Sequence, residues 1–234
     1  ETGAYLQAEM SLGRLTLVPG LRFDRFTMDG DEADQVFLDS LSPTPADFSD
    51  SAISSRIGAS FRVSNALTLT GQYAGGFRAP PYSAINSGFT NLAGGYTSLP
   101  NPALRAETSD NFELGFRSVV GRASLGVTGF SNLYEDFIQQ IALGLNPGTR
   151  LLEFRNENVT SARITGIELR GEVAFSPAWR LRGAYAAIRG HDTSGPTERP
   201  LGTVAPDQGS LGLEYASRAG RWGSEVMLRA AAGQ

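Results

Sequence analysis

Two tyrosines, Tyr82 and Tyr96, stand in a long stretch between two strand-like segments and offer the most specific chemistry in the chain. A phenolate is a hard oxygen donor that suits ferric iron, so either side chain could ligate an Fe(III) centre. The alternative is that a loop tyrosine packs on its own loop. Tyr96 is the stronger candidate, because Gly94 and Gly95 precede it, leave room beside it and let the backbone bend there.

Other residues with possible chemistry stand elsewhere. His191, the one histidine of the chain, is followed closely by Asp192 and Ser194. Nothing in the sequence orients these groups as a Ser-His-Asp triad, so no enzyme is predicted. His191 could be a second metal ligand or a substrate contact, although a solvated loop histidine is the ordinary alternative. A glycosylation sequon begins at Asn158, but it lies in a predicted strand and we discount it.

An acidic stretch is found near residues 27–51. Its carboxylates could hold calcium, although their spacing is not that of an EF-hand loop. A solvated charged loop is the ordinary alternative. The acidic residues concerned are Asp29, Asp31, Glu32, Asp34, Asp39, Asp47 and Asp50.

The composition excludes several classes of protein. A net charge of −4 argues against non-specific nucleic-acid binding, which needs a basic face. The chain has 28 glycines, which suit tight turns and close strand packing better than helices, and no cysteine. It contains no run of about 18 apolar residues, so no transmembrane helix is predicted. A membrane-spanning β-barrel, whose strands alternate apolar and polar residues, stays open.

Apolar and polar residues alternate with a period of two along most of the chain, which indicates β-strands. Ile167 and Leu169, for example, alternate with Glu168 and Arg170. The long predicted connections lie near 27–51, 78–108, 139–150 and 190–207, and those between them are short. We predict about ten strands, at 4–12, 15–26, 52–62, 67–77, 109–119, 122–138, 151–175, 179–189, 208–216 and 221–230.

Short and long connections alternate strictly, as in an outer-membrane barrel with short turns at one end and long loops at the other. Charges of both signs occupy one face of strand after strand, which would line the lumen while apolar side chains face lipid. Tyr5, Trp179 and Trp222 fit interfacial aromatic girdles. A water-soluble β protein with polar outer faces is the alternative. The predicted fold class is all-β: an antiparallel, up-and-down transmembrane β-barrel segment, with residues 1–234 in one domain.

Two short motifs frame the stretch that holds the two tyrosines. They are Phe77-Arg78-Ala79-Pro80 and Asn101-Pro102-Ala103-Leu104. They resemble the motifs written FRAP and NPNL in TonB-dependent outer-membrane receptors, specifically in the haem and haemoglobin receptor branch. Ala103 departs from the second motif. Many members also carry a haem-ligating histidine between the motifs, and this chain has none there.

The resemblance covers nearly the whole chain, in an order that matches the C-terminal half of a barrel of about 22 strands. It implies that an N-terminal plug and the final strands lie outside residues 1–234. The implied protein is not an enzyme and has no cofactor of its own. It would bind haem, free or from haemoglobin, at extracellular loops and import it with energy that the TonB complex delivers through the plug. Its surroundings would be outer-membrane lipid and lipopolysaccharide.

Another cargo, such as a ferric siderophore, is an alternative for a receptor of this kind, and a passive outer-membrane barrel is a further one. For haem, the resemblance makes Tyr96 the candidate iron ligand and Tyr82 the second choice. The paired glycines before Tyr96 would leave room for a flat macrocycle. Arg78 could bind a haem propionate, or pair with a carboxylate of the plug. Asn101, in the second motif, completes the predicted binding set, and its proline neighbour stiffens that end of the loop.

Overall fold

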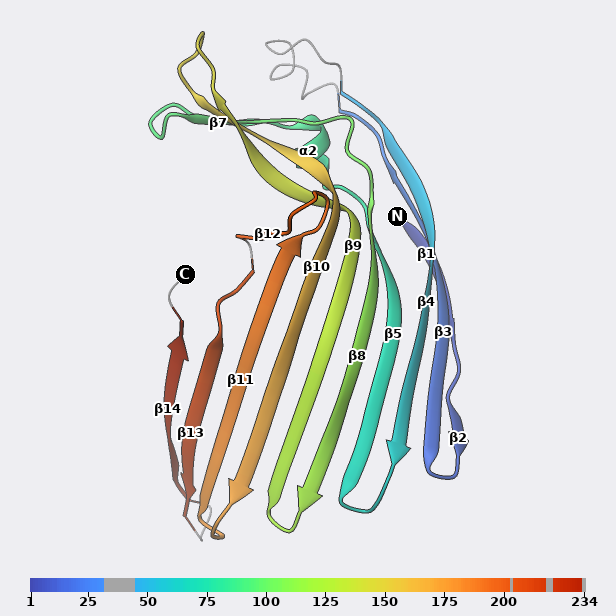
Figure 1. Ribbon diagram of the computed structural model, residues 1–234, viewed down its shortest axis with the longest axis vertical. Helices are drawn as coiled ribbons and strands as arrows, with labels where there is room; N and C mark the ends of the chain where they lie inside the picture. The colour runs from blue at the N-terminus through green and yellow to red at the C-terminus, as the bar shows by residue number, and fades with distance from the viewer. Residues whose placement is uncertain (32–44, 203, 218–220, 233–234) are drawn as a thin grey trace.

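The computed structural model of the protein describes residues 1–31, 45–202, 204–217 and 221–232 (Figure 1). In these ranges, ten strands follow one another through a single curved sheet, each antiparallel to its neighbours. The same ranges contain no helix with the length and hydropathy needed to cross a membrane. The prediction of an all-β antiparallel meander of about ten strands is confirmed.

The spatial order of the ten strands is their order in the sequence. In the described residues, tight turns such as 63–66 and 121–122 join adjacent strands at the lower end of Figure 1, and longer segments such as 79–106 join them at the upper end. Two tight turns favour glycine, because Gly13 and Gly121 have φ angles of +66° and +59°. The strands are β1 (Thr2–Gln7), β3 (Leu15–Met28), β4 (Phe48–Arg62), β5 (Leu67–Arg78), β8 (Glu107–Val120), β9 (Ala123–Leu145), β10 (Leu152–Ala174), β11 (Trp179–Asp192), β13 (Gln208–Ala216) and β14 (Gly223–Ala231).

The pairing register gives the sheet two chemically different faces. Leu169 on β10 stands opposite Val127 on β9 and Tyr185 on β11, so these three side chains share one face. Arg170 points to the other face, where its guanidinium lies 3.5 Å from the carboxylate of Glu168. The first face suits lipid contact and the second suits a polar lumen.

Aromatic side chains gather at the lower end of the sheet. The ring of Tyr215 lies 4.8 Å from that of Trp179 and 5.0 Å from that of Trp222, measured between centroids. This is where an interfacial girdle is expected. Tyr5 differs, because it stands opposite Arg22 and therefore lies on the face that carries the charges. The prediction that Tyr5 belongs to a girdle is wrong.

Three predicted boundaries are also wrong. The predicted strand 4–12 breaks after Gln7, and β2 (Met10–Leu12) pairs with β3 beyond the break. The predicted loop 139–150 is mostly strand, because β9 runs to Leu145. The predicted loop 190–207 contains β12 (Arg199–Pro200), which pairs with the end of β11. Paired strands can continue past the lipid-facing region without alternation, since the backbone ladder alone satisfies their polar groups.

Above the level where β8 begins, β9 and β10 continue as a two-stranded ribbon (Figure 1). The predicted loop 78–108 adds α2 (Tyr82–Asn86), β6 (Phe89–Asn91) and β7 (Tyr96–Leu99) beside it. Strand β7 runs parallel to the upper part of β10, and β6 is antiparallel to β7. This stretch was predicted as an irregular loop, but it forms part of a small upper sheet.

The sheet is divided at its upper end. Strands β4 and β5 pair only from Arg62 opposite Thr68 up to Arg56 opposite Ala74. Above that level β4 stays with β3, and β5 stays with β8. Helix α2 bridges the two parts with an apolar cluster that consists of Ala84, Ile85 and Leu104, surrounded by Met28, Ala46, Phe48 and Ile138.

Asn86 fastens α2 to the segment that leads into β4. Its side-chain Oδ1 accepts a hydrogen bond of 2.7 Å from the backbone N–H of Ala46, and its Nδ2 donates one of 2.8 Å to the carbonyl of the same residue. Asn86 is 0% exposed. Its amide therefore acts like one more rung of a β-ladder inside the upper cluster.

Candidate functional site

Tyr96 opens β7 directly after a tight turn. The backbone N–H of Gly95 donates a hydrogen bond of 3.3 Å to the carbonyl of Leu92, and Gly95 has a φ of +70°, which favours glycine. A Cβ atom on Gly94 would lie 2.9 Å from Cε1 of the Tyr96 ring. The two glycines thus provide the bend that the sequence suggested, and the Tyr96 ring packs against Gly94. Room for a macrocycle beside the ring stays a prediction.

Aromatic rings surround Tyr96. Its centroid lies 6.2 Å from that of Phe89 and 6.1 Å from that of Phe154, the second pair being edge-to-face. The register places Leu152 opposite Tyr96, and Leu145 opposite Leu152. We call these five residues the aromatic patch. Phe89 and Leu145 are 58% and 66% exposed, so the patch is an accessible apolar surface.

The aromatic patch continues the polar face of the barrel wall. Phe154 and Leu152 are separated from Glu168 and Arg170 by even numbers of residues along β10, so they lie on the same side of the strand. The lumen-type face of β10 therefore changes from charged to aromatic above the wall. Among the described residues, none is hydrogen-bonded to the Tyr96 hydroxyl, so its oxygen is available to another ligand.

Tyr82 is placed differently. It begins α2, is half-buried, and its hydroxyl accepts a hydrogen bond of 2.8 Å from the backbone N–H of Asp31. This bond ties α2 to the segment that follows β3. Tyr82 therefore packs on the β3 side of the loop, whereas Tyr96 lies on the β10 side.

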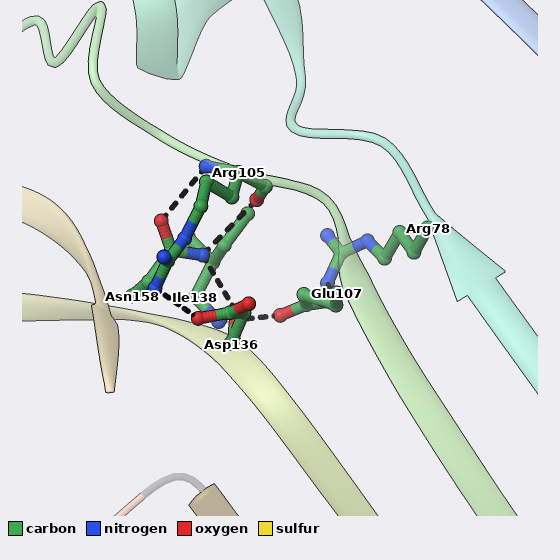
Figure 2. A network of polar contacts seen from close by, with 6 residues as sticks. All are labelled: Arg78, Arg105, Glu107, Asp136, Ile138 and Asn158. Atoms are coloured by element: carbon green, nitrogen blue, oxygen red, sulfur yellow. Dashed lines mark hydrogen bonds and ion pairs between the residues drawn. The ribbon is translucent and has the colours of Figure 1, made fainter. Parts of the chain in front are cut away.

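Arg78 and Glu107 close the base of the loop (Figure 2). They are opposite each other at the upper ends of β5 and β8, and Nη1 of Arg78 lies 3.1 Å from Oε2 of Glu107. The glutamate side chain is 6% exposed and the arginine 67%. The sequence suggested a propionate or a plug carboxylate as the partner of Arg78, and it did not indicate Glu107. Much of the guanidinium still faces solvent.

The side chain of Glu107 also accepts a hydrogen bond from the backbone of β9. The backbone N–H of Ile138 donates a hydrogen bond of 2.6 Å to Oε1 of Glu107. The β8–β9 ladder has ended below this point, its last rung being Thr108 opposite Glu135. The carboxylate thus supplies an acceptor that a longer β8 would have supplied.

Asn158 holds the loop from the other side (Figure 2). Its Oδ1 accepts a hydrogen bond of 2.8 Å from the N–H of Arg105, and its Nδ2 donates to the carbonyls of Arg105 and Asp136 at 3.0 Å and 2.6 Å. The guanidinium of Arg105 pairs with the carboxylate of Asp136, a residue with a φ of +53° that is uncommon outside glycine. We call Arg78, Arg105, Glu107, Asp136 and Asn158 the loop-anchoring network.

Asn101 shapes the end of the same loop. Its Oδ1 accepts a hydrogen bond of 3.0 Å from the N–H of Ala103, and its Nδ2 donates one of 2.8 Å to the carbonyl of Asn156 on β10. Both ends of the amide are engaged inside the chain. The contact of Asn101 with a cargo stays a prediction.

The remaining candidates do not assemble into a site in the described part of the chain. Asp192 accepts hydrogen bonds from the hydroxyl and the backbone N–H of Ser194, which lower the pKa of its carboxyl. The described ranges hold no cluster of three or more histidine, cysteine or acidic side chains suited to a metal ion. Glu32, Asp34 and Asp39 of the acidic stretch lie outside the described residues.

An antiparallel sheet with one lipid-type face, one charged face and its irregular segments at one end is part of the wall of an outer-membrane transport barrel. Residues 1–233 match the family model described as TonB dependent receptor-like, beta-barrel. The chain therefore belongs to the TonB-dependent receptor β-barrel family, whose members are bacterial outer-membrane receptors and transporters rather than enzymes.

Curated relatives share modest identity with the chain. It is 26% identical over 189 residues to the hemoglobin-haptoglobin utilization protein B of Neisseria meningitidis serogroup C, a match that covers 71% of the chain and 23% of that protein. It is 28% identical over 244 residues to the heme/hemopexin utilization protein C of Haemophilus influenzae, strain Rd, covering 92% of the chain and 32% of that protein. The chain thus spans about a quarter to a third of these relatives.

Solved structures agree with the fold. The copper transporter OprC superposes with a TM-score of 0.78 at 19% identity, covering 98% of this chain and 34% of that one. The hemophore receptor HasR of Serratia marcescens, in complex with its hemophore HasA and heme, gives 0.75 at 17% identity, covering 99% and 43%. At such identities these likenesses concern the fold alone, and the chain spans about a third to two fifths of these solved chains.

Proposed function

We propose that the receptor to which this chain belongs binds haem, free or from haemoglobin, at its extracellular loops and imports it with energy from the TonB complex. Relatives named for haemoglobin and haem utilization support this cargo. The energy would act through a plug outside residues 1–234, and outer-membrane lipid and lipopolysaccharide would surround the barrel. Haem is then the transported substrate and no cofactor is resident.

The observation that carries the proposal is the setting of Tyr96. Its ring is held by Phe89 and Phe154, while its hydroxyl is bonded to no described residue. A flat apolar macrocycle needs an apolar surface and an axial donor, and the aromatic patch offers both. Ferric iron would stabilise the phenolate directly, because the metal is the largest positive charge at such a site.

The other predicted residues have secondary roles in this proposal. Tyr82 is a weaker ligand candidate, because its hydroxyl oxygen already accepts the N–H of Asp31. Arg78 can meet a propionate with the guanidinium nitrogens that Glu107 does not bind. Asn101 would act by holding the loop against β10.

The test is a titration of the full-length receptor with ferric haem, followed by absorbance. Tyr96→Phe keeps the ring and removes the donor oxygen, so we expect a folded barrel with a shifted ferric haem spectrum. Tyr82→Phe is the matched control and should leave the spectrum unchanged. An unchanged spectrum in Tyr96→Phe would make Tyr96 a packing residue.

A ferric siderophore is the second candidate cargo, because the aromatic patch would also accept an aromatic chelate. Such a receptor has no need of the Tyr96 oxygen. Tyr96→Phe would then keep its uptake, and the wild-type receptor would give no ligated haem spectrum.

A further inference from the structure

We infer that Glu107 is a positioning residue for the Tyr96 site, which it serves by fixing the ribbon of β9 and β10 at a set angle to the barrel wall. This inference rests on the proposed function in one respect, namely that the placement of Tyr96 matters for cargo. The contact between Glu107 and the ribbon is independent of any cargo (Figure 2).

The ribbon leaves the wall at the point where Glu107 acts. Strand β9 is paired with β8 up to Glu135, and from there upward its free edge has lost its neighbour. Ile138 would present an unpaired N–H on that edge, and the Glu107 carboxylate accepts it at 2.6 Å. Because the side chain of Glu107 is nearly buried, this bond is sheltered from competing water.

Backbone pairing connects the Glu107 contact on β9 to Tyr96 on β7. The upper part of β9 pairs with β10, and β10 pairs with β7. The N–H of Leu152 donates a hydrogen bond of 2.9 Å to the carbonyl of Gly95, the residue before Tyr96. A rotation of the ribbon about its base would therefore move the aromatic patch as a unit.

The two oxygens of Glu107 have separate tasks. Oε1 holds the ribbon through Ile138, and Oε2 is paired with Arg78 at 3.1 Å. A buried carboxylate is costly unless it is paired, so Arg78 makes the buried acceptor tolerable. Glutamine can keep the first task without the second, whereas aspartate keeps the charge but is one methylene shorter.

The experiment uses the full-length receptor with spin labels at positions 92 and 120, both exposed in the structure, and measures the distance distribution between them by pulsed electron resonance. Position 92 reports the hairpin beside Tyr96, and position 120 reports the lower end of β8. Glu107→Ala should broaden or shift the distribution. Glu107→Gln should preserve it, as should Glu113→Ala, which removes an exposed carboxylate from the same strand.

A second measurement is the affinity for ferric haem of the same variants. We expect Glu107→Ala to weaken the haem affinity roughly tenfold or more, the size expected when one buried hydrogen bond is left unmade. Glu107→Gln should retain most of the haem affinity. An unchanged distance distribution in a folded Glu107→Ala receptor overturns the inference. A changed distribution with unchanged haem affinity also overturns it.

Two controls keep these outcomes distinct. If Glu107→Ala does not fold, Glu107→Asp replaces it. This variant keeps the charge but shortens the side chain by one methylene, so its carboxylate should no longer reach the N–H of Ile138 and the distance distribution should also change. If the wild-type receptor binds no haem, the proposed function fails, while the distance measurement still decides whether Glu107 fixes the ribbon.

Discussion

Leu169 and Arg170 are neighbours on β10. We expect Leu169→Arg to destabilise the folded barrel far more than Arg170→Leu. Leu169 lies five residues above Ala174, where β10 ends. At a rise of about 3.3 Å per residue and a tilt of about 40°, this is about 12 Å above the lower end of the strand. The apolar band of such barrels is about 25 Å tall, so Leu169 lies near its middle.

The magnitudes differ because the two side chains lie on opposite faces. A charge on the lipid face at the bilayer midplane costs about 2–4 kcal/mol, which we expect for Leu169→Arg. Arg170 is 80% exposed and pairs with Glu168 at 3.5 Å, an exposed ion pair worth about 0–1 kcal/mol. Arg170→Leu should therefore have at most a small effect.

The assay is equilibrium unfolding of the full-length receptor in lipid vesicles, with the folded fraction read from its altered mobility on an unheated gel. Leu169→Ala separates the loss of the leucine from the gain of the charge, and it should cost less than Leu169→Arg. Equal losses for Leu169→Arg and Arg170→Leu would refute the assigned register, since a slip by one residue exchanges the two faces.

Three further predictions follow from the upper end of the sheet. Asn86→Leu leaves the half-buried backbone N–H and C=O of Ala46 unpaired, so it should cost about 1–3 kcal/mol of local stability and speed hydrogen exchange in α2; unchanged exchange would contradict this. Cysteine at Thr90 should react with an impermeant reagent on intact cells and cysteine at Pro177 should not, and the reverse pattern would invert the orientation. Arg189 lowers the pKa of Asp207, so their pair stabilises the start of β13 above about pH 4 and is lost as the pH falls through that lowered pKa. Hydrogen exchange there should rise at low pH in the wild type but not in Asp207→Asn, and equal responses would argue against the pair.

The wall of the barrel was predictable because lipid and lumen impose a period of two on every strand. Leu169 and Arg170 show this directly, and turn residues such as Gly13 and Gly121 mark where strands reverse. Above the wall that constraint is absent. Gln139 and Gln140 stand next to each other in β9, so no alternation indicated that the strand continues.

The loop-anchoring network was hidden for a different reason. Its bonds depend on which residues become opposite one another after the strands pair. Arg78 and Glu107 are 29 residues apart, yet pairing of the two flanking strands makes them the last rung. Opposite charges at the two ends of a predicted loop were the available signal. Asn158 forms three hydrogen bonds in this network, but its sequence context indicated only a glycosylation sequon.

The short ladder between β4 and β5 makes the wall mechanically uneven. That ladder stops at Arg56 opposite Ala74, whereas the β9–β10 ladder runs from Val173 opposite Ala123 to Leu152 opposite Leu145. Among the ladders between β3 and β11, the β4–β5 ladder has the fewest paired residues, so a lateral load on that part of the upper rim would separate β4 from β5 first. Helix α2 lies across that seam, so the small apolar cluster that it buries would set the force at which the two strands begin to separate.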